Sequence, residues 1–141
     1  MANKIYTCLW FNNQALNAAT FYCSIFPNSA ITFKSPMVVH CNLNGLQLMG
    51  LNGGVMFPQT EAASLVVECN SQQEIDYYWS NLIANGGKAG QCGWCKDKYG
   101  VSWQIVPSIL GTLISNPAKA QQVSDAYRTM QKIDIATLVN A

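Results

Sequence analysis

The hydrophobic pattern of the first half of the chain predicts one strand, one helix and three further strands. Residues 6–11 are mostly apolar, as in a strand, and Asn12-Asn13 offers a cap for a helix that ends at Pro27. Three strand candidates follow, "AITFKS", "MVVHCNL" and "LQLMGL". The last two meet at Asn44-Gly45, which predicts a two-residue hairpin turn because both turn positions need a positive φ. The helix is predicted from apolar residues at helical spacing: Ala15, Ala18, Ala19, Tyr22, Ile25 and Phe26.

The same order of elements returns in the second half. Residues 63–69 predict a strand, and Ser71 with Glu74 forms a capping box that opens a helix ending at Gly86-Gly87. The segment "GQCGWCK", the turn "DKYG" and the strand "VSWQIV" follow. We expect the helix to bury Ile75, Tyr78, Trp79 and Leu82.

The repeat of the pattern predicts a duplicated module with a period of about 55 residues. Gly45 of the first hairpin corresponds to Gly100 of the second, and Met49 corresponds to Gln104. After Pro107 a further helix is predicted, with Asn116 as its cap and Pro117 in its first position. Its apolar stripe, expected to dock on the body of the protein or on a partner, is Ala120, Val123, Tyr127, Met130 and Ile133.

Composition narrows the function classes. Only 11% of the residues are charged, against a usual share of about 25%, and this predicts a large subunit interface and therefore a dimer. The net charge of +1 with no basic run excludes nucleic acid and anionic membranes as expected partners. No stretch approaches the roughly 18 apolar residues of a spanning helix. The first residues are interpreted as a strand and not as a signal peptide, so we expect a cytoplasmic protein whose six cysteines are free thiols.

The motif CGWC at Cys92–Cys95 admits a redox, a metal-binding and a structural interpretation. A redox dithiol begins a helix, whereas here a turn and another strand follow. On a strand the two residues would point to opposite faces about 10 Å apart, too far for a disulfide. A zinc site would need a second ligand pair, and the other cysteines are single and scattered. We interpret the pair as two cysteines on a strand; the alternative is a reactive Cys92 thiol, with Lys96 on the same strand face.

Four stretches together resemble one family. They are "CLWFNNQALNAATFYCSIFPNS", "LNGLQLMGLNGG", "QCGWCKDKYGVSWQIVP" and "MQKIDIATL", and the resemblance that they carry extends over nearly the whole chain. They are similar to the PhnB-like proteins, a branch of the vicinal oxygen chelate superfamily with glyoxalase I, bleomycin-resistance proteins and extradiol dioxygenases. Some of its members carry a demethylubiquinone methyltransferase label.

The resemblance implies an α+β fold of tandem βαβββ modules around a cavity, usually in a homodimer, with a C-terminal helix. We expect a single glyoxalase/bleomycin-resistance-like domain over residues 1–141. Module one would span about residues 1–56, module two about residues 60–107, and a C-terminal helical segment about residues 108–141. In the second module, one of the three strands after the helix is poorly marked.

The resemblance also implies where a divalent metal would be held in an enzyme of this superfamily. The ligand positions fall near Thr7 and Ser64 and at Met49 and Gln104, and only Gln104 has a suitable side chain. We therefore expect no metal site, which argues against glyoxalase and dioxygenase chemistry. No cofactor is predicted either, because Gly53-Gly54 is followed by "VMFPQT" and not by the start of a nucleotide-binding helix.

The predicted cavity is lined by His40, Met49, Cys92, Trp94, Ser102 and Gln104. Counting back from the Asn44-Gly45 turn pairs His40 with Met49, so both share one face. Ser102 and Gln104 share a face by alternation, with Trp103 and Ile105 opposite, and Cys92 and Trp94 are placed inside by analogy with the family. His40 is a candidate general base and Cys92 a candidate nucleophile; the alternative for each is a structural role.

The sequence thus predicts a cytoplasmic, homodimeric protein that binds a small apolar or aromatic molecule without a catalytic metal. One alternative is an enzyme of the same superfamily, a lyase or isomerase, a dioxygenase or a methyltransferase, which uses His40 or a metal. Another is a protein that assembles with a partner and has a vestigial cavity.

Overall fold

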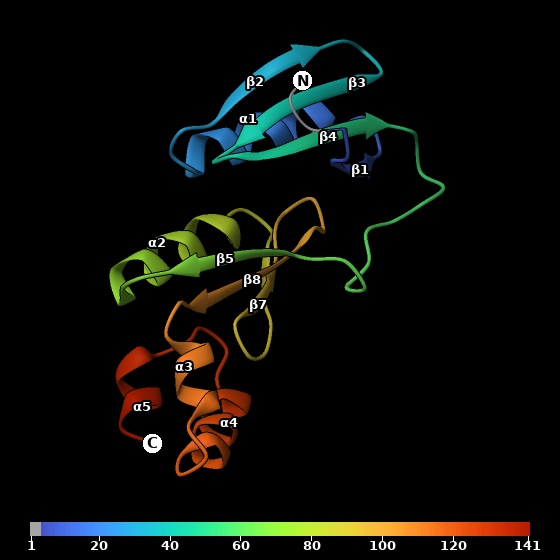
Figure 1. Cartoon of the computed structure of the whole chain (residues 1–141). Helices are drawn as coiled ribbons and strands as arrows, with labels where there is room; N and C mark the ends of the chain where they lie inside the picture. Colours follow the sequence, from blue (N-terminus) through green and yellow to red (C-terminus); the bar gives the residue numbers. More distant parts are fainter. Residues whose placement is uncertain (1–3) are drawn as a thin grey trace. The chain divides into compact units, whose positions relative to one another are not determined.

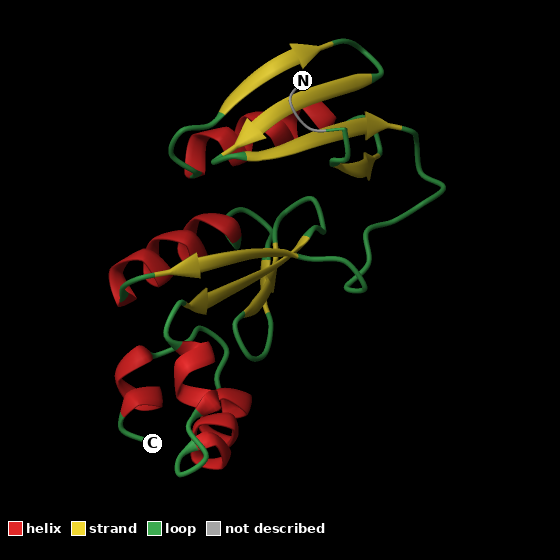
Figure 2. Cartoon of the chain, viewed as in Figure 1, coloured by secondary structure: helices red, strands yellow, loops and turns green. Residues whose placement is uncertain are grey.

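A computed structural model describes residues 4–141 (Figure 1). The chain forms two compact units, one up to Gln59 and one from Thr60 onward. Each unit holds one four-stranded sheet, and helices and strands are distinguished by colour in Figure 2. Within the described residues no helix combines the length and the apolar character needed to span a membrane.

The first unit is a βαβββ module. Its strand order is β1-β4-β3-β2, with β1 and β4 parallel and the other neighbours antiparallel. The parallel pair arises because α1 carries the chain back after β1. The elements are β1 (Thr7–Phe11), α1 (Ala15–Ile25), β2 (Ala30–Lys34), β3 (Val38–Leu43) and β4 (Leu46–Asn52).

The hairpin between β3 and β4 has the predicted turn. Asn44 and Gly45 adopt φ values of 49° and 95°, the left-handed region that a tight two-residue turn requires. Leu43 pairs with Leu46, and the register continues to His40 opposite Met49. The predicted pairing of His40 with Met49 is therefore confirmed.

Helix α1 packs against one face of this sheet through the predicted apolar stripe. The β3 and β4 side chains that alternate inward, among them Val39, Cys41 and Leu48, are buried there. Gly50 lets the two layers approach, because a Cβ at this position would lie 3.0 Å from the Ala15 Cβ. The prediction that Asn12-Asn13 caps this helix is wrong, because neither side chain forms a cap hydrogen bond. The helix begins at Ala15, whose N–H donates to Asn52 Oδ1 at 2.9 Å.

The second unit repeats the module and adds helices. Its strand order is β5-β8-β7-β6, the same topology as in the first unit, so the tandem βαβββ fold is confirmed. The poorly marked strand is β6, which has two residues. The elements are β5 (Leu65–Cys69), α2 (Gln72–Leu82), β6 (Lys88–Ala89), β7 (Trp94–Lys96) and β8 (Ser102–Pro107).

Helix α2 begins and packs as predicted. The Ser71 hydroxyl accepts the Glu74 N–H at 3.1 Å, while the Glu74 carboxylate accepts the Asn70 N–H at 2.7 Å. The helix ends at Leu82, four residues before Gly86-Gly87. Its buried side chains are the four expected ones, Ile75, Tyr78, Trp79 and Leu82.

The C-terminal segment is helical, but it is divided into three helices and not one. These are α3 (Leu110–Ser115), α4 (Ala120–Thr129) and α5 (Ile135–Val139). Of the predicted stripe, Val123 is buried in α4, whereas Met130 is the C-cap and Ile133 is buried beyond the end of the helix. Helix α4 ends with Met130 as its C-cap, and α5 begins with Asp134 as its N-cap. The Asp134 carboxylate accepts the Thr137 N–H at 3.1 Å.

Candidate functional site

The sheet of the second unit has one face covered by α2 and one that carries three of the predicted site residues, Trp94, Ser102 and Gln104. Cys95, Trp103 and Ile105 are buried on the α2 side, which agrees with the predicted alternation. On the other face, strand register places side chains in two rows. One row is Lys88, Lys96 and Ser102 on β6, β7 and β8, and the next is Trp94, Gln104 and Val66 on β7, β8 and β5.

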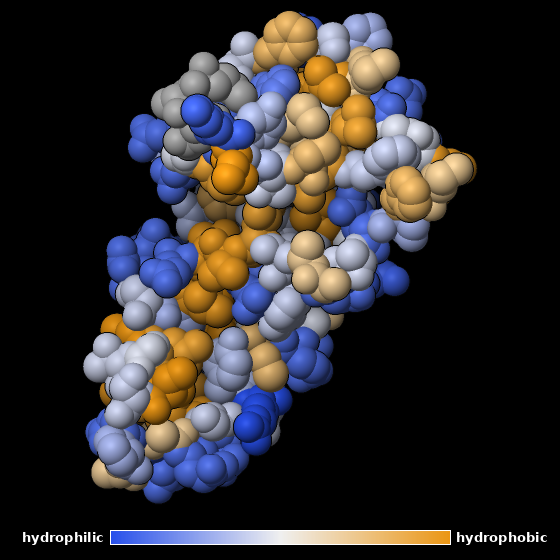
Figure 3. All heavy atoms as spheres, turned by 45° about the vertical axis from the view of Figure 1, so that its right-hand side comes forward, coloured by the Kyte–Doolittle hydropathy of each residue, from blue (hydrophilic) through white to orange (hydrophobic). Residues whose placement is uncertain are grey.

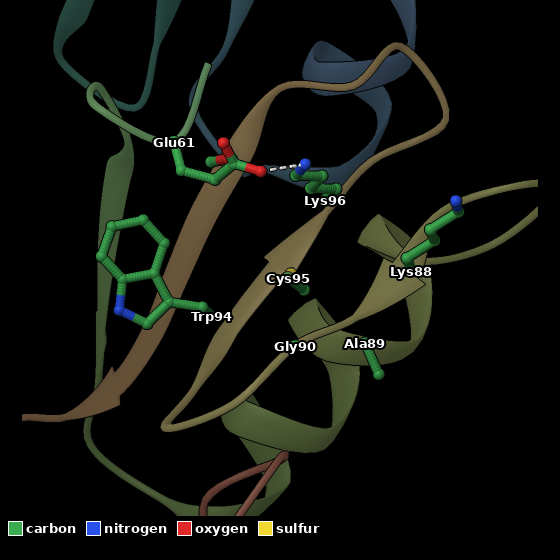
Figure 4. Close-up of a pocket in the computed structure, with 8 residues that line it drawn as sticks. Glu61, Lys88, Ala89, Gly90, Trp94, Cys95 and Lys96 are labelled. Atoms are coloured by element: carbon green, nitrogen blue, oxygen red, sulfur yellow. Dashed lines mark ion pairs between the residues drawn. The ribbon is translucent and has the colours of Figure 1, made fainter. Parts of the chain in front are cut away.

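A pocket of about 300 Å³ opens on this face (Figure 4). The indole of Trp94 lies at one side of the pocket. The Lys96 side chain points toward Glu61, which belongs to the segment before β5. Pockets that bind small molecules typically combine an apolar wall with a small number of polar groups. The lining residues are Glu61, Lys88, Ala89, Gly90, Trp94, Cys95, Lys96 and Ser102.

Ser102 is the buried polar group of this pocket. The residue is only 1% exposed, and its Oγ has no hydrogen-bond partner among residues 4–141. Leaving a buried hydroxyl unpaired costs roughly 1–3 kcal/mol, and most such groups in proteins are paired. Within the described residues, the Ser102 hydroxyl is therefore a hydrogen-bonding group whose capacity is unused.

The charged groups at the pocket are two lysines and one glutamate. The Lys96 ammonium forms an ion pair with Glu61, and this hydrogen bond holds the pKa of the Glu61 carboxyl below its usual value. Lys88 lies directly opposite Lys96, and within residues 4–141 it has no ion pair of its own. The pocket therefore carries a net positive charge.

Asp97 holds the turn that sets the register of these rows, and its role was missed in the sequence. Its Oδ1 accepts the N–H groups of Tyr99 at 2.8 Å and Val101 at 3.1 Å, and its Oδ2 accepts the Trp103 indole N–H at 2.9 Å. The aspartate at the start of the DKYG turn is a recognisable signal for the two backbone bonds. The bond to Trp103 required the fold.

Cys92 does not lie on a strand, so this part of the prediction is wrong. Strand β7 begins at Trp94, and Cys92 and Gly93 form a turn with φ values of 59° and 81°. The Cys92 N–H donates to the Met130 carbonyl at 2.7 Å, and its thiol lies 3.8 Å from the Arg128 carbonyl oxygen. Cys92 thus faces the C-terminal end of α4 and is not among the residues that line the pocket. All six cysteines are free.

His40 and Met49 lie side by side on the sheet face of the first unit that is opposite α1. The imidazole is flanked edge-on by the rings of Tyr6 and Phe33, each with its centroid at 5.8 Å. Its Nδ1 is buried and has no partner among residues 4–141. On β1 the residue paired with Met49 is Cys8, one position beyond Thr7.

A family model described as 3-demethylubiquinone-9 3-methyltransferase matches residues 3–106. The PhnB protein from Bacillus cereus is 32% identical, with 75% of this chain and 100% of that chain covered and a TM-score of 0.68. The chain belongs to the 3-demethylubiquinone-9 3-methyltransferase family. The predicted resemblance to PhnB-like proteins is confirmed. A search of the curated proteins gave no match.

Two more distant structures show that the fold of this family member is that of the vicinal oxygen chelate superfamily. A glyoxalase-related enzyme from Fulvimarina pelagi is 16% identical, covers 77% of this chain and 91% of its own, and has a TM-score of 0.55. The fosfomycin resistance protein FosX from Listeria monocytogenes, in complex with Mn(II) and sulfate, is also 16% identical with a TM-score of 0.55. That match covers 74% of this chain and 89% of FosX.

The side chains of this family member do not fit the divalent metal that the superfamily implies. At the positions expected from the resemblance stand Thr7, Met49, Ser64 and Gln104, of which none is a carboxylate or an imidazole. The Gln104 amide already donates to the Ser64 hydroxyl at 3.0 Å. Within residues 4–141 no three His, Cys, Asp or Glu side chains are grouped to hold a metal ion.

Gly53-Gly54 has a packing role in this family member. A Cβ at Gly53 would lie 2.2 Å from the Trp10 ring, and the Trp10 indole donates to the Gly54 carbonyl at 2.9 Å. The chain continues from there as an irregular segment. Close packing on Trp10 thus requires a glycine at position 53, and a φ of 101° favours a glycine at position 54.

Proposed function

We propose that the chain binds a small, largely aromatic molecule in the pocket on the open sheet face of the second unit. Ser102 carries the proposal: its buried hydroxyl, which has no hydrogen-bond partner among the described residues, lies on the same sheet face as the half-buried indole of Trp94. Gln104, in the same row as Trp94, adds an amide at the edge of that wall. An aromatic ring would stack on the indole while a polar atom of the ligand takes up the Ser102 hydroxyl.

A screen of aromatic fragments by ligand-observed NMR tests this site. We expect Trp94→Ala to lower the affinity of wild-type binders about tenfold and Ser102→Ala to lower it about fivefold, corresponding to roughly 1 kcal/mol for one hydrogen bond. Tyr77→Ala is the matched control, because Tyr77 is an exposed aromatic residue on α2. If fragments bound the Trp94→Ala variant with the same affinity as the wild type, the proposed binding site would be wrong.

A second candidate function, an enzyme of the same fold, rests on His40. Its buried Nδ1, which has no hydrogen-bond partner in the part of the chain that the structure describes, is suited to accept a proton or a hydrogen bond from a bound molecule. If the chain turns over a bound compound, His40→Gln should abolish product formation while fragment binding in the second unit persists. Product formation unchanged in His40→Gln would contradict a catalytic role.

The oligomeric state and the compartment are part of the same proposal. A homodimer would cover apolar side chains that are exposed in the first unit, among them Phe33, Met37 and Phe57. Figure 3 shows such apolar groups at the surface in both units. Six free thiols fit a reducing compartment such as the cytoplasm.

A further inference from the structure

We propose that the ligand of the second-unit pocket is an aromatic carboxylate, with its ring on Trp94 and its carboxylate beside Lys88 and Lys96. This inference rests on the proposed function and names the chemical class of the molecule bound. It follows from the two rows of side chains on the open face: one row is cationic and hydrogen-bonding, and the other is aromatic and apolar.

The cationic row is unbalanced. Lys88 and Lys96 lie directly opposite each other on neighbouring strands, an arrangement of like charges that destabilises a sheet. Among the residues that line the pocket, only Glu61 is acidic, and it pairs with Lys96. One positive charge is left over, so a bound anion with a single charge would remove the repulsion.

Ser102 completes the row on the next strand. It pairs with Lys96 in the register, so Lys88, Lys96 and Ser102 present three hydrogen-bond donors in a line across β6, β7 and β8. A carboxylate has two oxygen atoms that only accept hydrogen bonds, which matches a row of donors. A doubly charged phosphate would exceed the single positive charge and would be repelled by Glu61.

The aromatic part of the ligand is positioned by the neighbouring row. Trp94 and Lys96 are two residues apart on β7 and therefore on the same face, with their Cα atoms about 7 Å apart. Val66, which is 56% exposed, continues the row of Trp94 and Gln104 on β5. A flat ring on this surface leaves a carboxylate within reach of the flexible lysine side chains.

Glu61 acts against the ligand. Its carboxylate occupies Lys96, so an incoming carboxylate must displace it or share the ammonium group. Removing the Glu61 charge should therefore strengthen binding, whereas removing either lysine should weaken it. Opposite effects from neighbouring side chains distinguish charge recognition from general damage to the pocket.

The test compares naphthalene-2-carboxylate with naphthalene-2-carboxamide, which share the ring and differ in charge. Calorimetric titration of the full chain should show the carboxylate binding about tenfold more tightly. Lys88→Gln should reduce carboxylate affinity about tenfold and leave carboxamide affinity unchanged, and Glu61→Gln should raise carboxylate affinity about threefold. Lys119→Gln, at an exposed lysine that directly precedes α4, controls for net charge.

The salt dependence of binding tests the charge recognition with the wild-type protein alone. Carboxylate affinity should fall as sodium chloride rises, because ions screen the lysines, whereas carboxamide affinity should not. Equal binding of the two compounds at low salt would overturn the charge assignment and leave the aromatic site intact. If neither compound bound, the proposed site itself would be overturned together with this inference.

Discussion

At the scale of single residues, Asp97 and Ser102 show two different outcomes for a buried polar group. Both are at most 2% exposed, and they are the buried polar residues among positions 4–141. The Asp97 carboxylate accepts hydrogen bonds from Tyr99, Val101 and Trp103 and fixes the β7–β8 turn. Ser102 lies five residues further on, and its hydroxyl has no hydrogen-bond partner among the described residues. The burial of Asp97 is explained by its role in the turn, whereas Ser102 is the residue at which we expect a ligand to bind.

Asp97→Asn should destabilise the chain by about 1–3 kcal/mol, because the new amide NH₂ would face an N–H donor in place of an acceptor. Urea unfolding followed by tryptophan fluorescence measures the change. Asp125→Asn on the exposed surface of α4 is the control and should leave the midpoint almost unchanged. Equal midpoints for the two variants would show that the Asp97 bonds contribute nothing net.

The cysteines should differ widely in reactivity. Burial raises the pKa of Cys41, Cys69 and Cys95 to about 12, so at pH 8 only about one thiol in ten thousand is ionised at each. Their thiolates appear only as the pH rises toward that pKa, so their labelling should accelerate with pH. An iodoacetamide time course read by mass spectrometry should label exposed Cys8 before these three. Cys92 labelling ahead of Cys8 would support the reactive-thiol hypothesis.

At the scale of elements, a residue distant in sequence decides where α1 starts. Asn52, at the end of β4, accepts the Ala15 N–H through Oδ1 and donates to the Pro36 carbonyl through Nδ2 at 3.0 Å. Asn12 and Asn13 are adjacent to the helix, but Asn13 has a φ of 61° and serves the turn. The cap is thus a tertiary contact between a helix and the strand it packs against.

Asn52→Ala should cost about 1 kcal/mol or somewhat more, because it removes the cap and one further hydrogen bond. Asn12→Ala should have an effect near zero. Thermal unfolding by circular dichroism compares the two variants. A larger loss for Asn12→Ala than for Asn52→Ala would restore the local cap expected from the sequence.

The C-terminal helices give a second example at this scale. Gln72 on α2 donates to the Ile133 carbonyl at 2.9 Å and accepts the Ile135 N–H at 2.8 Å. These bonds hold the segment between α4 and α5 in a non-helical path while Ile133 is buried. A single amide therefore replaces two backbone partners that a continuous helix would have supplied.

At the scale of the whole molecule, two predictions concern assembly and metals. Native mass spectrometry of the purified protein at micromolar concentration should show a dimer, because apolar side chains of the first unit need cover. A monomeric mass would contradict the proposed homodimer.

The same spectra, recorded after incubation with nickel, zinc, iron and manganese, should show no stoichiometric metal. The neutral hydroxyl, thioether and amide groups at the expected positions bind such ions poorly. One metal ion per chain would overturn this assignment and would make glyoxalase-like and dioxygenase-like assays the next step.

The sequence by itself determined the order of the elements and the features made by neighbouring residues. Helical spacing identified the buried face of α2, and Asn44-Gly45 set the first hairpin and with it the pairing of His40 with Met49. Ser71 was recognised as a cap because donor and acceptor lie three residues apart. Such features depend on backbone preferences and spacing along a few residues, so they can be predicted without the fold.

Only the tertiary structure decided the composition of the candidate pocket. The row of Lys88, Lys96 and Ser102 joins three strands, and its register depends on turns at Cys92-Gly93 and Asp97–Gly100. One residue more or less in either turn would place the opposite side chains on this face. The ion pair of Glu61 with Lys96 and the burial of the Ser102 side chain likewise depend on segments far apart in sequence. Burial and charge pairing are properties of the packed chain, and no local pattern encodes them.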